Sequence, residues 1–284
     1  MFRPMVYEAA IGASEVEWAG RTYAEINEVA ERDGSVLVVP MGSLEQHGRH
    51  MPVMTDVYLA TAVGTAAAEA VASEVPVMVT PPMWVGYSPY HLYWGGTLTG
   101  EFLHLLQGLQ DVAFSGIDAG FDAVFFVNGH GGNDPLKSVA VQTVAAAAES
   151  PVEVLGVTYY YLAEPIIHDL RDSEMGGMSH AGEFETSLMM YLRPELVHEA
   201  EMEVNVRGER KGGYDHAFQD FFEDEGGAGR GNPLAVSASE GTKARTSGVT
   251  GDPTVATAAK GEIIFEFVRD ELADLLRDVH ANNR

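Results

Sequence analysis

The run Ser35-Val-Leu-Val-Val-Pro40 is followed directly by Met41-Gly-Ser-Leu-Glu-Gln-His-Gly-Arg-His-Met-Pro-Val-Met-Thr-Asp56. The first run is short, apolar and rich in β-branched residues, which predicts a buried strand. Loops that leave the carboxyl ends of such strands are where open α/β sheets bind ligands. The second run is such a loop, and it carries three potential metal ligands, Glu45, His47 and Asp56. We therefore expect it to form half of an active site.

The loop is compatible with two arrangements of these ligands. In an extended segment alternate residues share a face, so Glu45 and His47 would hold one ion together. A turn at Gly48 would instead spread them over two ions, and Asp56 has two oxygens with which to bridge the pair. Taken alone, the loop also allows a structural role in which Glu45 and Asp56 cap a helix and His47 bonds to the loop.

Apolar strand candidates recur along the chain, and helical patterns fall between them. The strands are expected at 35–40, 75–80, 121–128 and 152–160, and the helices at about 57–73, 100–118 and 134–148. This alternation favours βαβ units and predicts an α/β fold, a three-layer sandwich with a central, mainly parallel sheet. A final amphipathic helix is expected at 253–279. The Gly-rich, polar stretch at about 201–250 is interpreted as a long loop, which serves as a lid or a subunit contact.

Bulk properties narrow the class of protein. The 284 residues are 46% hydrophobic, enough for a sizeable core, and we expect a single domain over 1–284. The chain has no cysteine, so any metal would be held by His, Asp and Glu. It has 42 acidic and 17 basic residues, and the formal charge of -25 disfavours nucleic acid and anionic membranes as partners.

The acidic composition also suggests an environment. Only four of the basic residues are lysines, and an acidic, lysine-poor surface resembles that of proteins from salt-loving microbes, where salt screens the repulsion. No apolar run is long enough to span a bilayer, and the N-terminal sequence lacks the pattern of a signal peptide. We therefore expect a soluble, cytoplasmic and halophilic protein.

A second site segment reads Phe121-Asp-Ala-Val-Phe-Phe-Val-Asn-Gly-His-Gly-Gly-Asn133. It is an apolar strand that runs straight into a glycine-rich turn. Glycines let the backbone come close to a ligand, so His130 is expected at the strand end rather than inside the core. A plain turn with an incidental histidine is the alternative.

The third segment is His180-Ala-Gly-Glu-Phe-Glu-Thr-Ser187. If it is helical, His180, Glu183 and Ser187 share one face, while Glu185 lies nearly opposite Glu183. This spacing favours Glu183 over Glu185 as a ligand. The alternative is that His180 neighbours the N-terminal cap of the helix and that Glu185 is a buried structural carboxylate paired with an arginine.

The combined ligand set suits two divalent ions such as Zn, Mn or Fe. Its members are Glu45, His47, Asp56, His130 and Glu183. Two ions about 4 Å apart would lower the pKa of a bridging water and polarise a carbonyl group, so hydrolysis would need no protein nucleophile. His180 would transfer a proton to the leaving nitrogen.

The loop Trp84–Thr97 is rich in aromatic and hydrogen-bonding groups. We expect it to form a pocket wall for a flat or ring-shaped small molecule, with Ser88, Tyr90 and His91 as substrate contacts. A self-packed surface loop or an oligomer contact is the alternative.

The motifs Gly42–Gly48 with Asp56, Asn128–Asn133 and His180–Ser187 resemble those of the creatininase family, the creatinine amidohydrolases, in order and spacing over roughly 15–200. The resemblance implies an α/β fold with a parallel sheet and a dinuclear metal centre that hydrolyses an amide C-N bond. It also implies a homo-oligomer, commonly a hexamer.

By this resemblance Glu45 and His130 would hold one ion, His47 the second, and Asp56 would bridge them. Creatininase has a second-ion glutamate two residues after its turn histidine, where this chain has Gly132. Glu183 is then the expected replacement, as a ligand that takes part in catalysis with His180.

Creatinine itself is not the expected substrate. Creatininase has a tyrosine near the bound ring where this chain has Gly131, a further expected substrate contact, and no tryptophan shortly precedes His180. The leading hypothesis is a metal-dependent amidohydrolase acting on a non-peptide C-N bond of a small molecule. The alternatives are a ring-ketone hydrolase of the keto-inositol type and a non-catalytic metal-binding assembly protein.

Overall fold

The computed structural model describes residues 14–149, 151–206, 222 and 247–284. Its centre is a parallel sheet in the order β2-β1-β3-β4. The strands are β1 (Val36–Met41), β2 (Val77–Val79), β3 (Ala123–Asn128) and β4 (Glu153–Thr158). Strands β1 and β3 are buried along their whole length, as their continuous apolar sequence predicts for a sheet covered on both faces.

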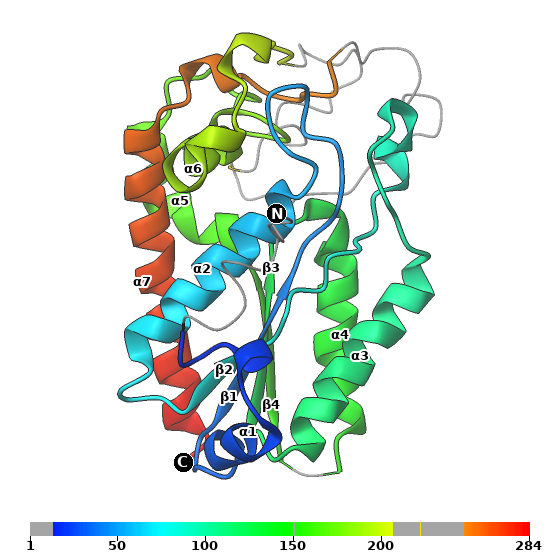
Figure 1. The fold of residues 1–284 in the computed structure, drawn as a ribbon, viewed down its shortest axis with the longest axis vertical. Helices are drawn as coiled ribbons and strands as arrows, with labels where there is room; N and C mark the ends of the chain where they lie inside the picture. The colour runs from blue at the N-terminus through cyan, green and yellow to red at the C-terminus, as the bar shows by residue number, and fades with distance from the viewer. Residues whose placement is uncertain (1–13, 150, 207–221, 223–246) are drawn as a thin grey trace, which may run out of the picture.

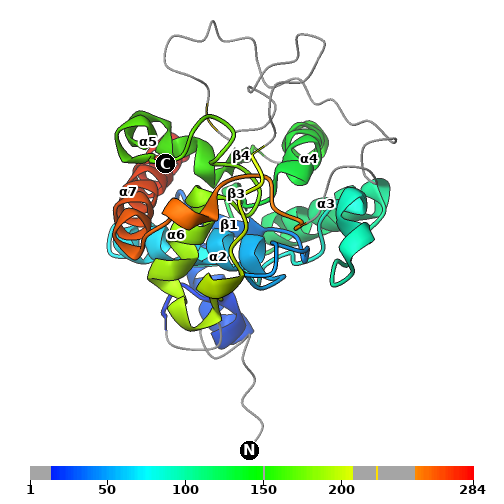
Figure 2. The same cartoon turned by 90° about the horizontal axis from the view of Figure 1, so that it is seen from above.

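Two layers of helices enclose this sheet (Figure 1). Helices α2 (Thr55–Val71) and α7 (Ala258–Asn282) cover one face, and α3 (Phe102–Asp118) and α4 (Asp134–Ala147) cover the other. Alternate residues of β1 divide between the two cores: Val38 packs on the side of α2 and α7, and Leu37 on the side of α3 and α4. Figure 2 shows the same division from above.

The remaining elements complete the edges of the sandwich. Helix α1 (Tyr23–Ala30) joins the core on the α3 side, and α6 (Glu183–Leu192) packs on α7. The others are α5 (Glu164–Leu170) and short 3-10 helices at Trp18–Gly20, Pro89–Trp94, Gly131–Asn133, Tyr159–Ala163, Pro194–Leu196, Glu199–Glu201 and Pro253–Val255.

The three-layer α/β fold predicted from the sequence is confirmed, and each strand and helix range expected above contains an element of that type. Strand β2 is shorter than expected because Pro76 precedes it and Pro81 and Pro82 follow it, and a proline cannot donate to the ladder. The final helix begins only at Ala258, after a 3-10 turn. Of the segment 201–250, residues 207–221 and 223–246 lie outside the described part of the chain.

Within the described ranges, no helix combines the length and the hydropathy needed to cross a bilayer. The expectation of one domain over the whole chain remains a prediction.

Helices α6 and α7 approach each other closely at Gly261. A Cβ atom at this position would overlap the backbone carbonyl of Ser187, in the middle of α6. Backbone atoms of a packed helix cannot move aside as the end of a flexible side chain can, so glycine is the residue that fits here.

This contact predicts opposite effects for two helical Gly→Ala substitutions. Gly261→Ala should lower the free energy of unfolding by about 1–3 kcal/mol through overpacking. The matched variant Gly108→Ala in α3, where a Cβ would meet only Met83 Cε at 3.6 Å, should raise it by up to about 1 kcal/mol through helix propensity. Urea unfolding of both variants makes the measurement. Equal effects would contradict the close approach.

Candidate metal centre

The ends of β1 and β3 meet the N-terminus of α2 at two glycines. A Cβ at Gly42 would lie 2.5 Å from the backbone nitrogen of Val57, and one at Gly129 would lie 2.5 Å from the carbonyl oxygen of Asp56. The first turn of α2 therefore sits directly against both strand ends. Asp56 thus lies between the loop after β1 and the turn after β3.

The loop after β1 folds back on itself before it reaches α2. His47 pairs with Met51 in an isolated bridge, and Gly48 turns the chain with a φ of 66°. The turn at Gly48 that the sequence allowed is therefore present. Glu45 and His47 are both buried within this loop.

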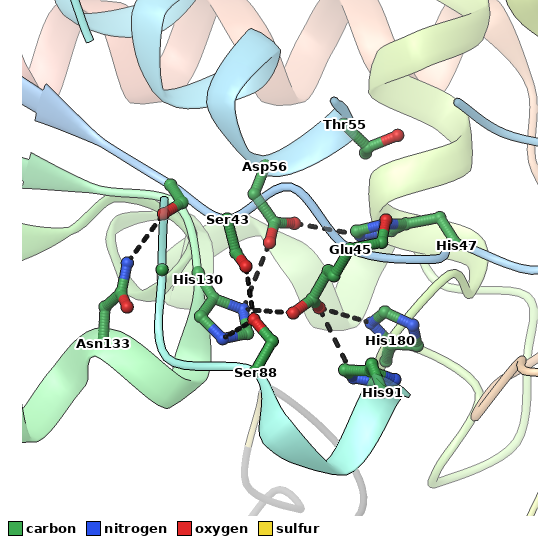
Figure 3. Close-up of polar contacts among 12 residues, drawn as sticks. Ser43, Glu45, His47, Thr55, Asp56, Ser88, His91, His130, Asn133 and His180 are labelled. Carbon is green, nitrogen blue, oxygen red and sulfur yellow. Dashed lines mark hydrogen bonds and ion pairs between the residues drawn. The ribbon is translucent and has the colours of Figure 1, made fainter. Parts of the chain in front are cut away.

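Asp56 bridges the two halves of the site (Figure 3). Its Oδ1 lies 2.9 Å from His47 Nε2, and its Oδ2 lies 3.1 Å from His130 Nδ1. Glu45 Oε2 lies 3.3 Å from the same His130 nitrogen, while Glu185 Oε2 lies 3.7 Å from His47 Nε2. Each oxygen of Asp56 thus belongs to a different set of potential ligands.

Three groups of side chains in the described residues have ligand atoms close enough for a metal ion. They are Glu45, Asp56 and His130; His47, Asp56 and Glu185; and Glu45, His47 and His180. In each group the ligand atoms lie within 4.8 Å of one another. The first two groups share only Asp56, and its two oxygens face different groups.

Unpaired buried atoms support the interpretation of these residues as ligands. Glu45 Oε2, Asp56 Oδ2 and His47 Nε2 are buried and make no well-aligned hydrogen bond within the protein, although each lies within 3.3 Å of another potential ligand. Buried polar atoms without a partner are rare in folded proteins. All three point into the two groups that share Asp56, so a cation between them would satisfy all three.

In His47 and His130, the ring nitrogen that does not face Asp56 lies close to a backbone carbonyl oxygen. His47 Nδ1 lies 3.1 Å from the carbonyl oxygen of Glu45, and His130 Nε2 lies 3.2 Å from that of Tyr87. A carbonyl only accepts, so each of these nitrogens carries the ring hydrogen. In the neutral ring, the form that binds metal, the nitrogen that faces Asp56 then has a free lone pair, as a metal ligand requires. The nitrogen and oxygen donor set fits Zn, Mn or Fe.

The structure places Glu183 away from this cluster. Its carboxylate accepts the backbone N-H groups of Asp172 and Ser173 at 3.0 and 2.9 Å, and it pairs with Lys260 Nζ at 2.5 Å. These bonds hold the loop before α6 and the start of α7. Glu183 is therefore not placed as the predicted replacement ligand. Glu185 faces His47 instead.

The backbone before α6 explains this exchange. The helix begins at Glu183, so His180 is not part of it and the helical spacing from His180 does not apply. Ala181 has a φ of 56°, the one positive value at a non-glycine residue in the described chain. Its N-H group donates to Glu185 Oε2 at 2.6 Å. This turn directs His180 and Glu185 to the same centre.

The charged groups of the site compensate one another. Burial raises the pKa of the Glu45 carboxyl, but the neighbouring His130, His91 and His180 outweigh it and hold this pKa well below its usual value. Burial lowers the pKa of His47, but Asp56 and Glu185 raise it well above the usual value. Strong mutual shifts of this kind are typical of functional sites.

His180 differs from the other two site imidazoles. Burial, His91 and His47 together outweigh Glu45 and hold its pKa well below the usual value. Its side chain is 15% exposed, whereas those of His47 and His130 are 0% and 5% exposed. His180 is therefore the most accessible of these imidazoles.

The expected substrate contacts lie around His130. Ser88 Oγ and Tyr90 OH are 3.3 and 3.2 Å from His130 Nε2, and Ser88 also contacts Ser43. His91 also contacts the cluster of potential ligands, because its Nε2 lies 3.4 Å from Glu45 Oε1. Gly131 lies in the turn after His130, where a Cβ would be 3.3 Å from Tyr160 OH.

Tyr90 occupies the space beside Gly132. A Cβ at Gly132 would overlap the Tyr90 hydroxyl group and would also lie 2.5 Å from His130 Nε2. No side chain can therefore stand at position 132 in this structure. The carboxylate that faces His47 comes instead from α6, as Glu185.

Two polar residues were not identified from the sequence. Gln46 lies between two ligands but is not itself a ligand type, so no chemical signal distinguished it. Asn133 Nδ2 donates to the Gly42 carbonyl, and its Oδ1 accepts from Tyr87 N-H, which joins the two loops around His130. Its place in the glycine-rich motif was the available signal.

The fold and the site together define an α/β protein with a buried cluster of His, Asp and Glu at the carboxyl edge of a parallel sheet. Residues 19–276 match the creatininase (creatinine amidohydrolase) family. The chain belongs to this family.

Individual relatives agree with this assignment. The chain is 31% identical to a mycofactocin precursor peptide peptidase of Mycobacterium ulcerans over 258 residues, which covers 85% of this chain and 84% of that protein. It is 29% identical to a 3-dehydro-scyllo-inosose hydrolase of Thermotoga maritima over 255 residues, 86% of this chain and 77% of that protein.

A solved structure shows the same fold. A structure described as creatininase Mn superimposes with a TM-score of 0.77 at 24% sequence identity. The superposition covers 93% of this chain and 98% of the other.

The two glutamates of α6 make a matched pair for mutation. Glu185→Gln should lose one bound ion, because it removes a charged ligand of one group. Glu183→Gln should keep the metal content but lower the free energy of unfolding by about 3 kcal/mol, because it breaks a buried ion pair. Metal analysis and urea unfolding give both quantities. Loss of an ion in Glu183→Gln with full retention in Glu185→Gln would restore the sequence-based assignment.

Proposed function

We propose that the protein is a dinuclear metal-dependent amidohydrolase that cleaves a non-peptide C-N bond of a small molecule. The observation that carries this proposal is the sharing of Asp56 between two groups of potential ligands. One ion would be held by Glu45, Asp56 and His130, and the other by His47, Asp56 and Glu185. Membership of the creatininase family supports the same chemistry.

The residues of the metal centre have separate roles in hydrolysis. Two divalent ions, when bound, lower the pKa of water and polarise a substrate carbonyl group. Asp56 holds both ligand groups together, and the backbone carbonyls behind His47 and His130 orient these rings. His180, at the exposed side of the cluster, gives a proton to the leaving nitrogen and regains one from the attacking water.

We propose Zn, Mn or Fe as the bound metal. The donors are imidazole nitrogens and carboxylate oxygens, and the chain has no cysteine to favour a thiolate site. The structural neighbour described as creatininase Mn supports manganese as one member of this set.

The substrate pocket is proposed to lie beside His130, with Ser88, Tyr90, His91 and Gly131 around it. The relatives are named for a peptide, an inosose and creatinine, so the family works on several classes of substrate. A ring-ketone hydrolase of the keto-inositol type is the second candidate, favoured by the 29% identity to the inosose hydrolase.

We also propose a homo-oligomer, in keeping with the family. Exposed apolar side chains gather along one segment, at Leu92, Tyr93, Leu98 and Leu103. Exposed apolar groups that lie close together are typical of interaction surfaces.

The metal-binding part of the proposal is tested by Asp56→Asn. The wild-type chain should bind about two divalent ions, and the variant should lose both and hydrolyse its substrate more than about 100-fold more slowly. That loss exceeds what removal of a residue that merely supports a ligand produces. The exposed Asp111→Asn serves as the control, with metal content and rate unchanged. A metal-free wild-type chain of normal stability would exclude the proposal.

The substrate class is tested by a hydrolysis screen of the metal-loaded protein at high salt. The screen covers creatinine, formamidopyrimidines, cyclic ureas and keto-inositols. We expect turnover of a cyclic or linear amide and little turnover of creatinine. Turnover of the keto-inositols alone would favour the second candidate.

A further inference from the structure

We propose that Gln46 is a positioning residue that fixes the tautomers of His91 and His180, so that both rings direct an N-H group at Glu45. The inference rests on the proposed function, in which His180 transfers a proton, and it names the residue that prepares His180 for this role. The Gln46 side chain is buried between the two histidines and the loop at Gly248.

Two backbone groups decide which end of the Gln46 amide faces the histidines. The N-H group of Gly48 donates to Gln46 Oε1 at 3.0 Å, and Gln46 Nε2 donates to the carbonyl of Gly248 at 2.9 Å. Turning the amide over would bring two N-H groups together at Gly48 and two carbonyl oxygens together at Gly248. Both hydrogen bonds would be lost, so the orientation follows from the network.

Both of these backbone groups belong to glycines with positive φ. The φ values are 66° at Gly48 and 79° at Gly248. A Cβ at Gly248 would overlap Gln46 Oε1. The backbone can therefore approach the amide closely at Gly248 only without a side chain.

The amide nitrogen then determines which nitrogen of each imidazole carries the ring hydrogen. Gln46 Nε2 lies 2.8 Å from His91 Nδ1 and 2.9 Å from His180 Nε2. An amide nitrogen donates and does not accept, so both facing ring nitrogens must be without hydrogen. Its two hydrogens serve three acceptors, so one of them is shared. A neutral ring has one hydrogen, which leaves His91 protonated on Nε2 and His180 on Nδ1.

These two N-H groups meet at one oxygen of Glu45. His91 Nε2 and His180 Nδ1 lie 3.4 and 3.3 Å from Glu45 Oε1. The other oxygen, Oε2, faces His130 in the first ligand group. Glu45 thus uses one oxygen toward the metal position and the other toward two imidazoles.

This arrangement keeps His180 out of the coordination of the ions. The third group of potential ligands consists of Glu45, His47 and His180. His180 Nε2 accepts from Gln46, so only Nδ1 could bind an ion within this group, and Nδ1 carries the hydrogen. Gln46 therefore leaves two groups for metal and keeps a hydrogen on the His180 nitrogen that faces the cluster.

The tautomers can be measured directly by ¹⁵N NMR of the zinc-loaded full chain with labelled histidine, with His91→Gln and His180→Gln used to assign the signals. We expect His180 protonated on Nδ1 and His91 on Nε2. A hydrogen on either nitrogen that faces Gln46 would overturn the proposal. The measurement does not depend on turnover, so it stands apart from a failure of the proposed function.

Gln46→Glu tests the effect on catalysis. A carboxylate accepts, so His91 Nδ1 and His180 Nε2 should become protonated, and kcat should fall by about 100-fold, the usual share of a positioned acid or base. KM should change by less than about twofold. Gln110→Glu, whose glutamine bonds Thr143 away from the site, should leave both unchanged. Unchanged ring nitrogens or an unchanged kcat in Gln46→Glu would refute the role of Gln46.

Discussion

The close contact between the N-terminus of α2 and the ends of β1 and β3 is the constraint on which the rest of the site depends. Gly42 and Gly129 leave no room for a side chain against the first turn of α2. This contact places Asp56 between His47 and His130, so the two loops meet at one carboxylate. A helix N-terminus also favours negative charge, which stabilises a buried aspartate at this position.

Charge compensation inside the cluster allows several carboxylates to be buried together. Glu45, Asp56 and Glu185 are nearly inaccessible to solvent, and an isolated buried carboxylate is costly. The imidazoles of His47 and His130 lie within 3.7 Å of these oxygens, and their raised pKa values reflect that proximity. The two imidazoles therefore offset part of the negative charge of the three buried carboxylates.

The sequence predicted the sheet, its flanking helices and the location of the loops that build the site, because apolar runs and glycine-rich turns are local signals. It did not predict which glutamate of α6 faces the cluster. That choice depends on the positive φ of Ala181, and alanine gives no sign of a left-handed conformation, whereas glycine would. The role of Gln46 was also hidden, because it depends on Gly248, which is 202 residues away in the chain.

Glu185 connects the cluster of potential ligands to the C-terminal helix. In α6, Glu185 faces His47, while Glu183 pairs with Lys260 at the start of α7. Gly261, the next residue, lets α7 pack directly on the α6 backbone. The position of the ligand therefore depends on the packing of a helix near the end of the chain. Beside Gly132, the Tyr90 hydroxyl group lies 3.2 Å from His130 Nε2, so the absence of a side chain at position 132 leaves room for Tyr90 in the wall of the proposed substrate pocket.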